Sequence, residues 1–311
     1  MQILRFLCIS TLLTVLVGCV SPVQTPEEVS RNNDLLATQI LQLKSKSSET
    51  IQNNVLDNTP TLQRASGIYF GLALDGISPA FEGDIKRVQS LFFDKIAKGP
   101  SLLLSNSETN KQIYPRADFK TMPEAAKAVG DYIVETDVGL VAPSLKVVVV
   151  SAHGRDKHLQ LRVGKYRIQG EVSDAYLLKL LNDIDGTGKT PMLLIISACH
   201  SGSFIPLLAA PNRIIMTAAA SGKLSFGCGT NSKNTAFTEY LLSQNIDTKL
   251  SLRRIFDDTL QRIIDFELKM KITTSSPQIS VGKDMQNLYE APIEKWHAIL
   301  KKEKVNSNAN N

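Results

Sequence analysis

The sequence predicts a mainly parallel β-sheet with helices packed on both faces, and three observations lead to this fold class. Short unbroken apolar runs recur along the 311-residue chain, as in strands that are buried on both faces of a sheet. Segments with the apolar spacing of amphipathic helices alternate with these runs, which is the pattern of parallel strands joined by crossover helices. Two of the runs end in reactive side chains, and open α/β sheets place such groups at the carboxyl ends of strands.

The first half of the predicted domain contains three strands and two helices. The strands are the apolar runs at residues 67–74, 102–104 and 146–150. A helix is expected over residues 83–97, because apolar side chains recur on one face: Ile85, Val88, Leu91, Phe92 and Ile96. A second helix is expected over residues 122–136, with an apolar side formed by Ala125, Ala126, Val129, Tyr132 and Ile133.

The second half continues the alternation of strands and helices. Apolar and polar residues alternate over 158–163, and a turn at Gly164-Lys165 with a return over 166–168 predicts an exposed hairpin. Ser173 is expected to cap a helix that ends near Ile184. The remaining strands are expected at residues 191–196 and 213–217, and the remaining helices at residues 205–208, 235–243 and 252–271.

The N-terminal residues are typical of an export signal. An apolar core over residues 6–17 follows Arg5, and it is too short to span a bilayer comfortably. It ends in Leu16-Val17-Gly18-Cys19, which resembles the bacterial lipobox and predicts a signal peptide over residues 1–18 and a lipidated Cys19. The alternative, a membrane helix, is disfavoured by this length and by the polar residues that follow. We therefore expect a lipid-anchored protein of the bacterial cell envelope that faces the periplasm, and Val20 favours the outer membrane.

The rest of the chain divides into a tether, one domain and a tail. Residues 19–62 are polar and are expected to be a tether, with a short helix indicated by the spacing of Leu35, Leu36, Ile40, Leu41 and Leu43. The compact domain is expected over residues 63–290. A last helix is expected around Ile293, Trp296 and Ile299 within residues 291–311, followed by a disordered tail over 306–311.

Two of the predicted strands end in groups that suit nucleophilic catalysis. The strand at 146–150 leads into Ser-Ala-His153-Gly154, and the strand at 191–196 leads into Ser-Ala-Cys199-His200-Ser-Gly-Ser. A cysteine thiolate attacks carbonyl carbon well, and an imidazole can deprotonate the thiol and later protonate the leaving amine. The backbone N–H groups of Gly154 and Cys199 are candidates to stabilise the oxyanion.

Purely structural roles for these residues remain alternatives to catalysis. A cysteine at a strand end is often a small core residue, so either motif alone would be unconvincing. The chain has four cysteines, of which Cys8 lies in the signal and Cys19 at the lipidation site. The other two, Cys199 and Cys228, could instead form one structural disulfide, which would exclude a nucleophilic Cys199.

Composition narrows the classes of ligand and partner. No paired CxxC or HxxxH is present, so we expect no metal site and no cofactor, and His158 and His297 are expected to face solvent. The net charge of +5 is spread along the chain, which argues against nucleic-acid binding. A polypeptide substrate and a membrane are the partners that the sequence indicates, and it does not indicate an oligomeric state.

The motifs resemble those of the legumain family of cysteine peptidases, which shares its fold with the caspases, and in particular its bacterial, membrane-anchored branch. The similarity covers about residues 67–282 and includes the His153 and Cys199 motifs, a segment from Met216 to Cys228, and Ser276-Pro277-Gln278. The resemblance implies a caspase-like α/β/α sandwich around a six-stranded sheet, and peptide hydrolysis through a thioester. It implies that His153 is the general base and acid and Cys199 the nucleophile, with Gly154 and Cys199 as oxyanion donors. Ser225 would flank the substrate pocket, with His200 and Ser197 beside the cleft.

The chain departs from the family pattern in the specificity pocket. Legumains cut after Asn or Asp with a basic residue after the first strand and an acidic one two positions before the nucleophile, whereas residues 78–82 here lack Arg or His and Ser197 occupies the second position. The resemblance therefore does not extend to cut-site preference. The leading hypothesis is a lipid-anchored cysteine endopeptidase. The alternatives are a transpeptidase and a non-catalytic lipoprotein that uses the scaffold as a binding module.

Overall fold

The computed structural model of the chain describes residues 24–53, 65–108, 112–136, 145–164, 167–185, 188, 190–242 and 246–309. The predicted signal peptide and the lipidation site at Cys19 lie outside these residues. Among the described helices, none combines the length and the apolar character that crossing a membrane requires.

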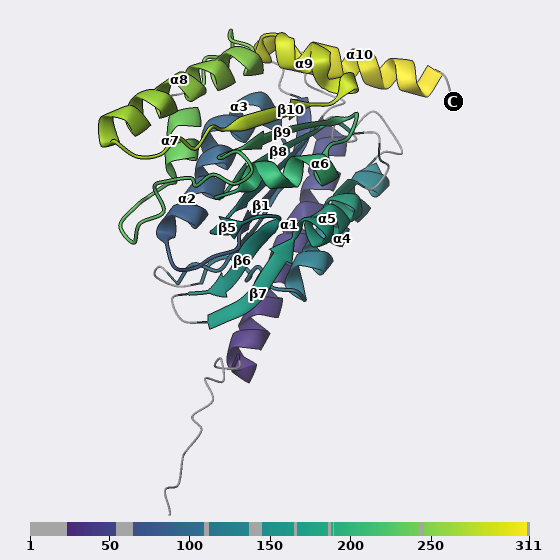
Figure 1. Cartoon of the computed structure of the whole chain (residues 1–311). Helices are drawn as coiled ribbons and strands as arrows, with labels where there is room; N and C mark the ends of the chain where they lie inside the picture. Colours follow the sequence, from purple (N-terminus) through teal and green to yellow (C-terminus); the bar gives the residue numbers. More distant parts are fainter. Residues whose placement is uncertain are drawn as a thin grey trace, which may run out of the picture.

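A central sheet forms the middle layer of the molecule (Figure 1). Its strand order is β10-β9-β8-β4-β1-β2, and β3 also pairs with β1. The strands are β1 (Ala65–Ala73), β2 (Ala97–Lys98), β3 (Ser101–Ser105), β4 (Leu145–Ser151), β8 (Met192–Ser197), β9 (Arg213–Thr217) and β10 (Gln278–Val281). Strands β2 and β3 pair with successive parts of β1, so they share one position and the sheet is six strands wide. Every pairing is parallel except that of β10 with β9, which confirms the predicted mainly parallel sheet.

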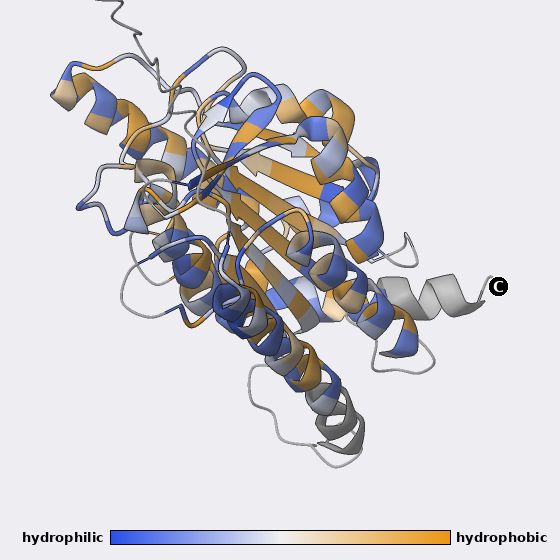
Figure 2. Cartoon of the chain, turned by 90° about the horizontal axis from the view of Figure 1, so that it is seen from below, coloured by the Kyte–Doolittle hydropathy of each residue, from blue (hydrophilic) through white to orange (hydrophobic). Residues whose placement is uncertain are grey.

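Strands β1 and β4 show why the apolar runs are unbroken, because alternate side chains enter cores on opposite faces. In β4, Val148 and Val150 join one core, whereas Val147 and Val149 join the other. Figure 2 shows the strands as apolar ribbons between helices whose outer sides are polar. Burial on both faces therefore replaces the polar–apolar alternation of a half-exposed strand.

Helices cover both faces, as predicted. On one face the core includes side chains from α1 (Pro26–Asn53), α4 (Thr121–Thr136), α5 (Asp174–Asp185) and α6 (Ile205–Leu208). On the other face it includes side chains from α2 (Pro79–Val88), α3 (Asp94–Ile96), α7 (Ala236–Leu241), α8 (Leu252–Met270), α9 (Gln286–Glu290) and α10 (Trp296–Ala309). Short turns of other helix types are the π-helix η1 (Gln89–Phe93) and the 3₁₀ helices η2 (Ser201–Phe204), η3 (Lys283–Met285) and η4 (Ile293–Lys295).

A second, three-stranded antiparallel sheet contains β5 (Gly154–Arg155), β6 (His158–Val163) and β7 (Arg167–Ser173). It confirms the predicted hairpin, and the oxygen of Ser173 accepts from the N–H of Tyr176 at 3.1 Å, as expected for a helix cap. The hairpin is not exposed on both faces, because Leu159 and Leu161 are buried. The sheet begins directly after His153, so it fixes the backbone that leaves that histidine.

The expected polar tether is instead a helix that packs on the domain. Leu36 and Leu43 of α1 are buried in the core that α4 also contributes to. The side chain of Gln39 pairs with the backbone of Leu103 in β3, donating to its carbonyl at 3.1 Å and accepting from its N–H at 3.0 Å. These bonds occupy backbone groups on the outer side of β3, an edge that otherwise invites unwanted strand pairing. The amphipathic spacing predicted a helix here, but the sequence did not show that it has a docking surface.

The start of α1 is held by a cluster of charges. Glu28 and Thr25 form a capping box, in which each side chain accepts from the other's backbone N–H. The Glu28 carboxylate also pairs with Arg167 of β7 at 2.6 and 3.0 Å and with Arg116 at 3.5 Å. The hydrogen bonds from Arg167 and from the Thr25 N–H lower the pKa of Glu28 to about 2. The cluster therefore ties α1 to the hairpin that follows His153.

Two boundaries differ from those expected. The helix expected over 83–97 begins at Pro79, because Ser78 caps it by accepting from the Ala80 N–H at 3.2 Å, and Pro suits the first helical position. Helix α10 continues to Ala309, where a disordered tail was expected from Asn306. Strand β10 was not predicted, because its four residues carry no apolar run.

Candidate active site

The site lies where two neighbouring parallel strands end side by side. Ser151 at the end of β4 pairs in register with Ser197 at the end of β8, and the Ala152 N–H donates to the Ser197 carbonyl at 3.2 Å. His153 and Cys199 each follow this matched pair by two residues. The register therefore places the predicted base and nucleophile at one edge of the sheet, as the sequence led us to expect.

The backbone around Cys199 makes a sharp turn that leaves its thiol half-exposed. His200 adopts a left-handed conformation with φ of 57°, and its N–H donates to the Lys223 carbonyl at 2.8 Å. The Cys199 sulfur lies 3.2 Å from the N–H nitrogen of Ser225 and 3.5 Å from its carbonyl oxygen. The turn thus presents the thiol to the segment at 223–228, and Ser225 lies beside Cys199.

His153 is half-buried and is bounded by an aromatic ring and a second thiol. The rings of Phe81 and His153 pack edge to face, with their centroids 5.1 Å apart. The Nδ1 atom of His153 lies 3.9 Å from the sulfur of Cys228. The sequence offered Cys228 as a possible disulfide partner of Cys199, and the structure brings it to the imidazole that Cys199 was expected to use.

Asp75 is a further member of the site that sequence reasoning missed. Its side chain is fully buried just beyond β1, where Oδ1 accepts from the Ile77 N–H at 3.0 Å and lies 3.7 Å from Arg162. Its Oδ2 has no hydrogen-bond partner among the described residues. Burial raises the pKa of Asp75, and of the two charges that lower it, His153 has a larger effect than Arg162. The one available signal was an acidic residue at the end of a strand adjacent to β4.

Gly154 allows the two strand ends to approach each other closely. A Cβ atom built at this position would lie 2.4 Å from the carbonyl oxygen of Cys199 and 3.1 Å from the Cβ of Ala198. No side chain fits there without a shift of the backbone. The proximity of the two residues agrees with the expectation that both contribute N–H groups to one oxyanion site.

Beneath the site, Asp84 joins the segments that carry these groups. This buried carboxylate of α2 accepts from Ser151 at 2.7 Å and from the backbone and the hydroxyl of Thr235, both at 2.9 Å. Burial is the largest influence on Asp84 and raises its pKa, against the hydrogen bonds that lower it. Thr235 caps α7 and its hydroxyl also contacts that of Ser197 at 2.7 Å. One side chain therefore connects the end of β4, the end of β8 and the start of α7.

One of the expected substrate contacts, Ser197, differs from the prediction, whereas nothing tests the expectation for His200. Ser197 is fully buried and bonded to Thr235, which argues against direct contact with substrate and makes it part of the support below the site. His200 is half-buried, and its Nδ1 has no hydrogen-bond partner among the described residues. Of the predicted pocket residues, Ser225 is therefore the one with a direct contact to the nucleophile.

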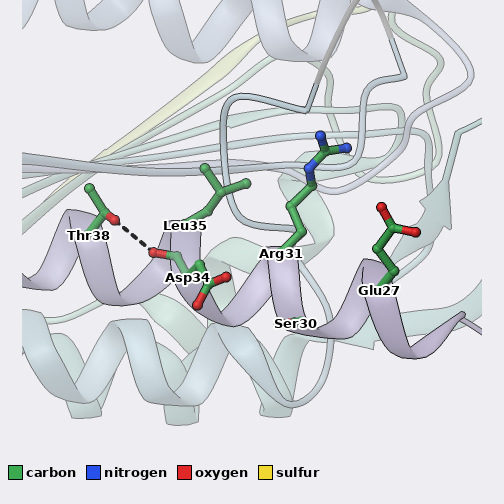
Figure 3. Close-up of a pocket in the computed structure, with 6 residues that line it drawn as sticks. All are labelled: Glu27, Ser30, Arg31, Asp34, Leu35 and Thr38. Carbon is green, nitrogen blue, oxygen red and sulfur yellow. Dashed lines mark hydrogen bonds between the residues drawn. The ribbon is translucent and has the colours of Figure 1, made fainter.

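The hollow along α1 does not carry the chemistry. A hollow of about 350 Å³ runs along α1, lined by Glu27, Ser30, Arg31, Asp34, Leu35 and Thr38. Figure 3 shows Glu27, Arg31 and Leu35 on the same side of the helix, with no cysteine or histidine among the lining residues. Within the described ranges, no group of three or more His, Cys, Asp or Glu side chains is placed to hold a metal ion.

The fold and the site define a class of protein: an α/β/α sandwich with a mainly parallel sheet that carries a thiol and an imidazole beyond the ends of adjacent strands. The model of the Peptidase C13 family matches residues 146–288, a range that contains His153, Gly154, Cys199 and Cys228. This match spans a little under half of the chain, and it makes the chain similar to the legumain-like cysteine endopeptidases of that family. The crystal structure of caspase-1 from Spodoptera frugiperda is similar, with 14% identity and a TM-score of 0.47, covering 72% of this chain and 91% of that one. No curated protein sequence matches the chain.

Proposed function

We propose that the chain is an endopeptidase in which Cys199 attacks the scissile carbonyl and His153 moves the protons. The observation that supports this proposal is the matched register of Ser151 and Ser197, because His153 and Cys199 each follow that pair by two residues at the ends of neighbouring strands. In this arrangement the imidazole deprotonates the thiol and later protonates the leaving amine. A thioester on Cys199 results, and water hydrolyses it.

The surroundings of the two groups suit this chemistry. The N–H groups of Gly154 and Cys199 stabilise the oxyanion that forms on the attacked carbonyl, since the backbones approach closely there. Asp75 stabilises the imidazolium that forms when His153 takes the proton, because its buried carboxylate already interacts with that ring. Both effects favour the charge-separated states of the reaction over the resting state.

The substrate is a polypeptide, and the segment at 223–228 forms one wall of its site. Ser225 is half-exposed and holds the Cys199 sulfur through its backbone, so substrate lying along this segment passes the nucleophile. An amine could resolve the thioester in place of water, which would make the enzyme a transpeptidase. Product analysis with and without an added amine separates these outcomes.

We further propose that lipid on Cys19 holds the domain at the bacterial envelope, on the periplasmic side and at the outer membrane. The support is the lipobox-like sequence that precedes this residue and the identity of Val20. Metabolic labelling with a palmitate analogue tests this, because Cys19→Ala should abolish incorporation while the domain still folds. Incorporation that persists in Cys19→Ala contradicts the anchor.

Peptide cleavage by the purified full chain tests the central proposal. We expect cleavage of a fluorogenic peptide library by the wild type, loss of at least about 10³-fold in Cys199→Ala, and a loss of about 10²–10⁴-fold in His153→Ala. His158→Ala is the matched control, because the Nδ1 of His158 contacts the nearby Asp156 carbonyl at 2.8 Å and, among the described residues, bonds to no group of the site. Equal activity in Cys199→Ala and the wild type would contradict the assignment. A folded wild type without any cleavage would favour the binding module.

A further inference from the structure

The proposed mechanism leaves one nucleophilic side chain of the site unused. Cys199 and Cys228 are both free thiols, and both are half-buried. Cys228 lies three residues beyond Ser225, whose backbone holds the Cys199 sulfur, and its own sulfur lies 3.9 Å from His153 Nδ1. One thiol therefore lies beside the imidazole and the other beside Ser225, three residues away from Cys228 along the chain, and only one thiol is needed for peptide hydrolysis.

We propose that Cys228 is a resolving cysteine that forms a reversible disulfide with Cys199 and switches the peptidase off. The inference rests on the proposed function in that Cys199 is the nucleophile, but formation of the bond does not require peptidase activity. Nothing in the hydrolytic reaction accounts for a second thiol against His153. A second thiol at this position is explained if it blocks Cys199 by forming a disulfide with it.

The local backbone can accommodate such a bond. Gly227 and Gly229 flank Cys228, and Gly227 has a φ of 88° that few other residues adopt. A Cβ at Gly229 would meet only Ser232 Oγ, at 3.4 Å, whereas one at Gly227 would lie 2.4 Å from the Ala236 nitrogen, so the turn has space on its Gly229 side and is fixed on its Gly227 side. A disulfide needs Cα atoms separated by roughly 4.4–6.8 Å, so formation of the bond requires the Gly229 side of the turn to bring Cys228 to that distance from Cys199.

Electrostatics keep Cys228 unreactive until it is needed. Burial raises the pKa of the Cys228 thiol, and the charge of Cys199 is the next largest contribution. Asp75 and Asp84 raise it further. Cys228 is therefore a poor thiolate at rest, and a bond from Cys199 to another sulfur removes one of the influences that raise its pKa.

The reaction balances with a low-molecular-weight disulfide such as glutathione disulfide as oxidant. The Cys199 thiolate attacks one oxidant sulfur, which breaks the oxidant's S–S bond and releases one glutathione thiolate. The Cys199 proton passes to this first glutathione thiolate, so His153 is free to accept the Cys228 proton, and the Cys228 thiolate attacks the Cys199 sulfur of the mixed disulfide. The second glutathione leaves as a thiolate and takes that proton. Two protein thiols lose two electrons and two protons in total, and one oxidant disulfide becomes two thiols.

Oxidation of the reduced full chain with glutathione disulfide tests the switch. Trypsin can separate the two cysteines, because Arg213 and Lys223 lie between them. We expect their peptides to be joined in the non-reduced digest and separate after dithiothreitol. We also expect peptidase activity to fall at least about tenfold on oxidation and to return on reduction. In Cys228→Ser, glutathione should instead remain attached to Cys199.

Each remaining outcome is decisive. Stable glutathione on Cys199 of the wild type, with no joined peptides, overturns the inference, as does a Cys199 that remains reduced while the protein is folded. A protein that forms the joined peptides but never cleaves a peptide substrate supports the disulfide and contradicts only the proposed peptidase. Active peptidase that survives oxidation contradicts the switch and leaves the proposed function intact.

Discussion

Replacing Gly154 by alanine should damage catalysis much more than folding. The added Cβ would lie 2.4 Å from the Cys199 carbonyl oxygen, whereas ordinary contacts begin at about 3.4 Å. The strand ends that carry His153 and Cys199 must therefore separate by about 1 Å, a displacement that can reduce turnover about 10²-fold. The same overpacking should cost about 1–3 kcal/mol of the free energy of unfolding.

The assay for this variant compares kcat/KM on a peptide substrate with the denaturant midpoint and with the rate of Cys199 alkylation. Gly229→Ala is the matched control, since its Cβ would meet only Ser232 Oγ at 3.4 Å. We expect both variants to fold, with the large loss of kcat/KM confined to Gly154→Ala. If Gly154→Ala retained wild-type kcat/KM, catalysis would not depend on the close approach of the two strand ends, and the prediction would be refuted.

Three other substitutions test the charges around the site. Glu28→Gln should lower the free energy of unfolding by about 1–2 kcal/mol near neutral pH. Because the folded pKa of Glu28 is about 2, against an ordinary 4.5, this difference should shrink as pH falls from 4.5 toward 2; a gap independent of pH would refute the ion cluster. Asp84→Asn should destabilise by about 2–4 kcal/mol in denaturant melts and slow Cys199 alkylation, since Ser151 and Thr235 lose their shared acceptor; unchanged alkylation would exclude a positioning role. Asp75→Asn should lower kcat about tenfold or more with little change in KM, measured across pH, and an unaltered pH profile would contradict its effect on His153.

The strands and the two catalytic candidates were predictable from the sequence because local signals sufficed. The apolar runs that form β4 and β8 are buried on both faces, so the sequence of each run by itself predicted a strand of a parallel sheet, whichever strands it pairs with. His153 and Cys199 follow those runs directly, so their common edge of the sheet was fixed by strand polarity. The docking of α1 and the antiparallel β10 depend on distant surfaces and left little local trace.

Asp75, Asp84 and Cys228 were missed or misjudged for a shared reason. Each matters through contacts with residues more than 60 positions away along the chain, such as Ser151 for Asp84 and His153 for Cys228. Neither the type nor the spacing of these residues identifies such partners. The same limit explains Ser197, which was expected beside substrate but is bonded beneath the site by Thr235.

Trapping the acyl-enzyme tests the central claim most directly, because Cys228 also lies near the imidazole that we assign to Cys199. A slowly hydrolysed peptide ester or an irreversible peptidyl ketone is added to the reduced full chain, and the modified cysteine is located by mass spectrometry. Our account predicts one adduct per chain on Cys199, formed markedly more slowly in His153→Ala. An adduct on Cys228 in place of Cys199, or one whose rate ignores His153, would contradict it.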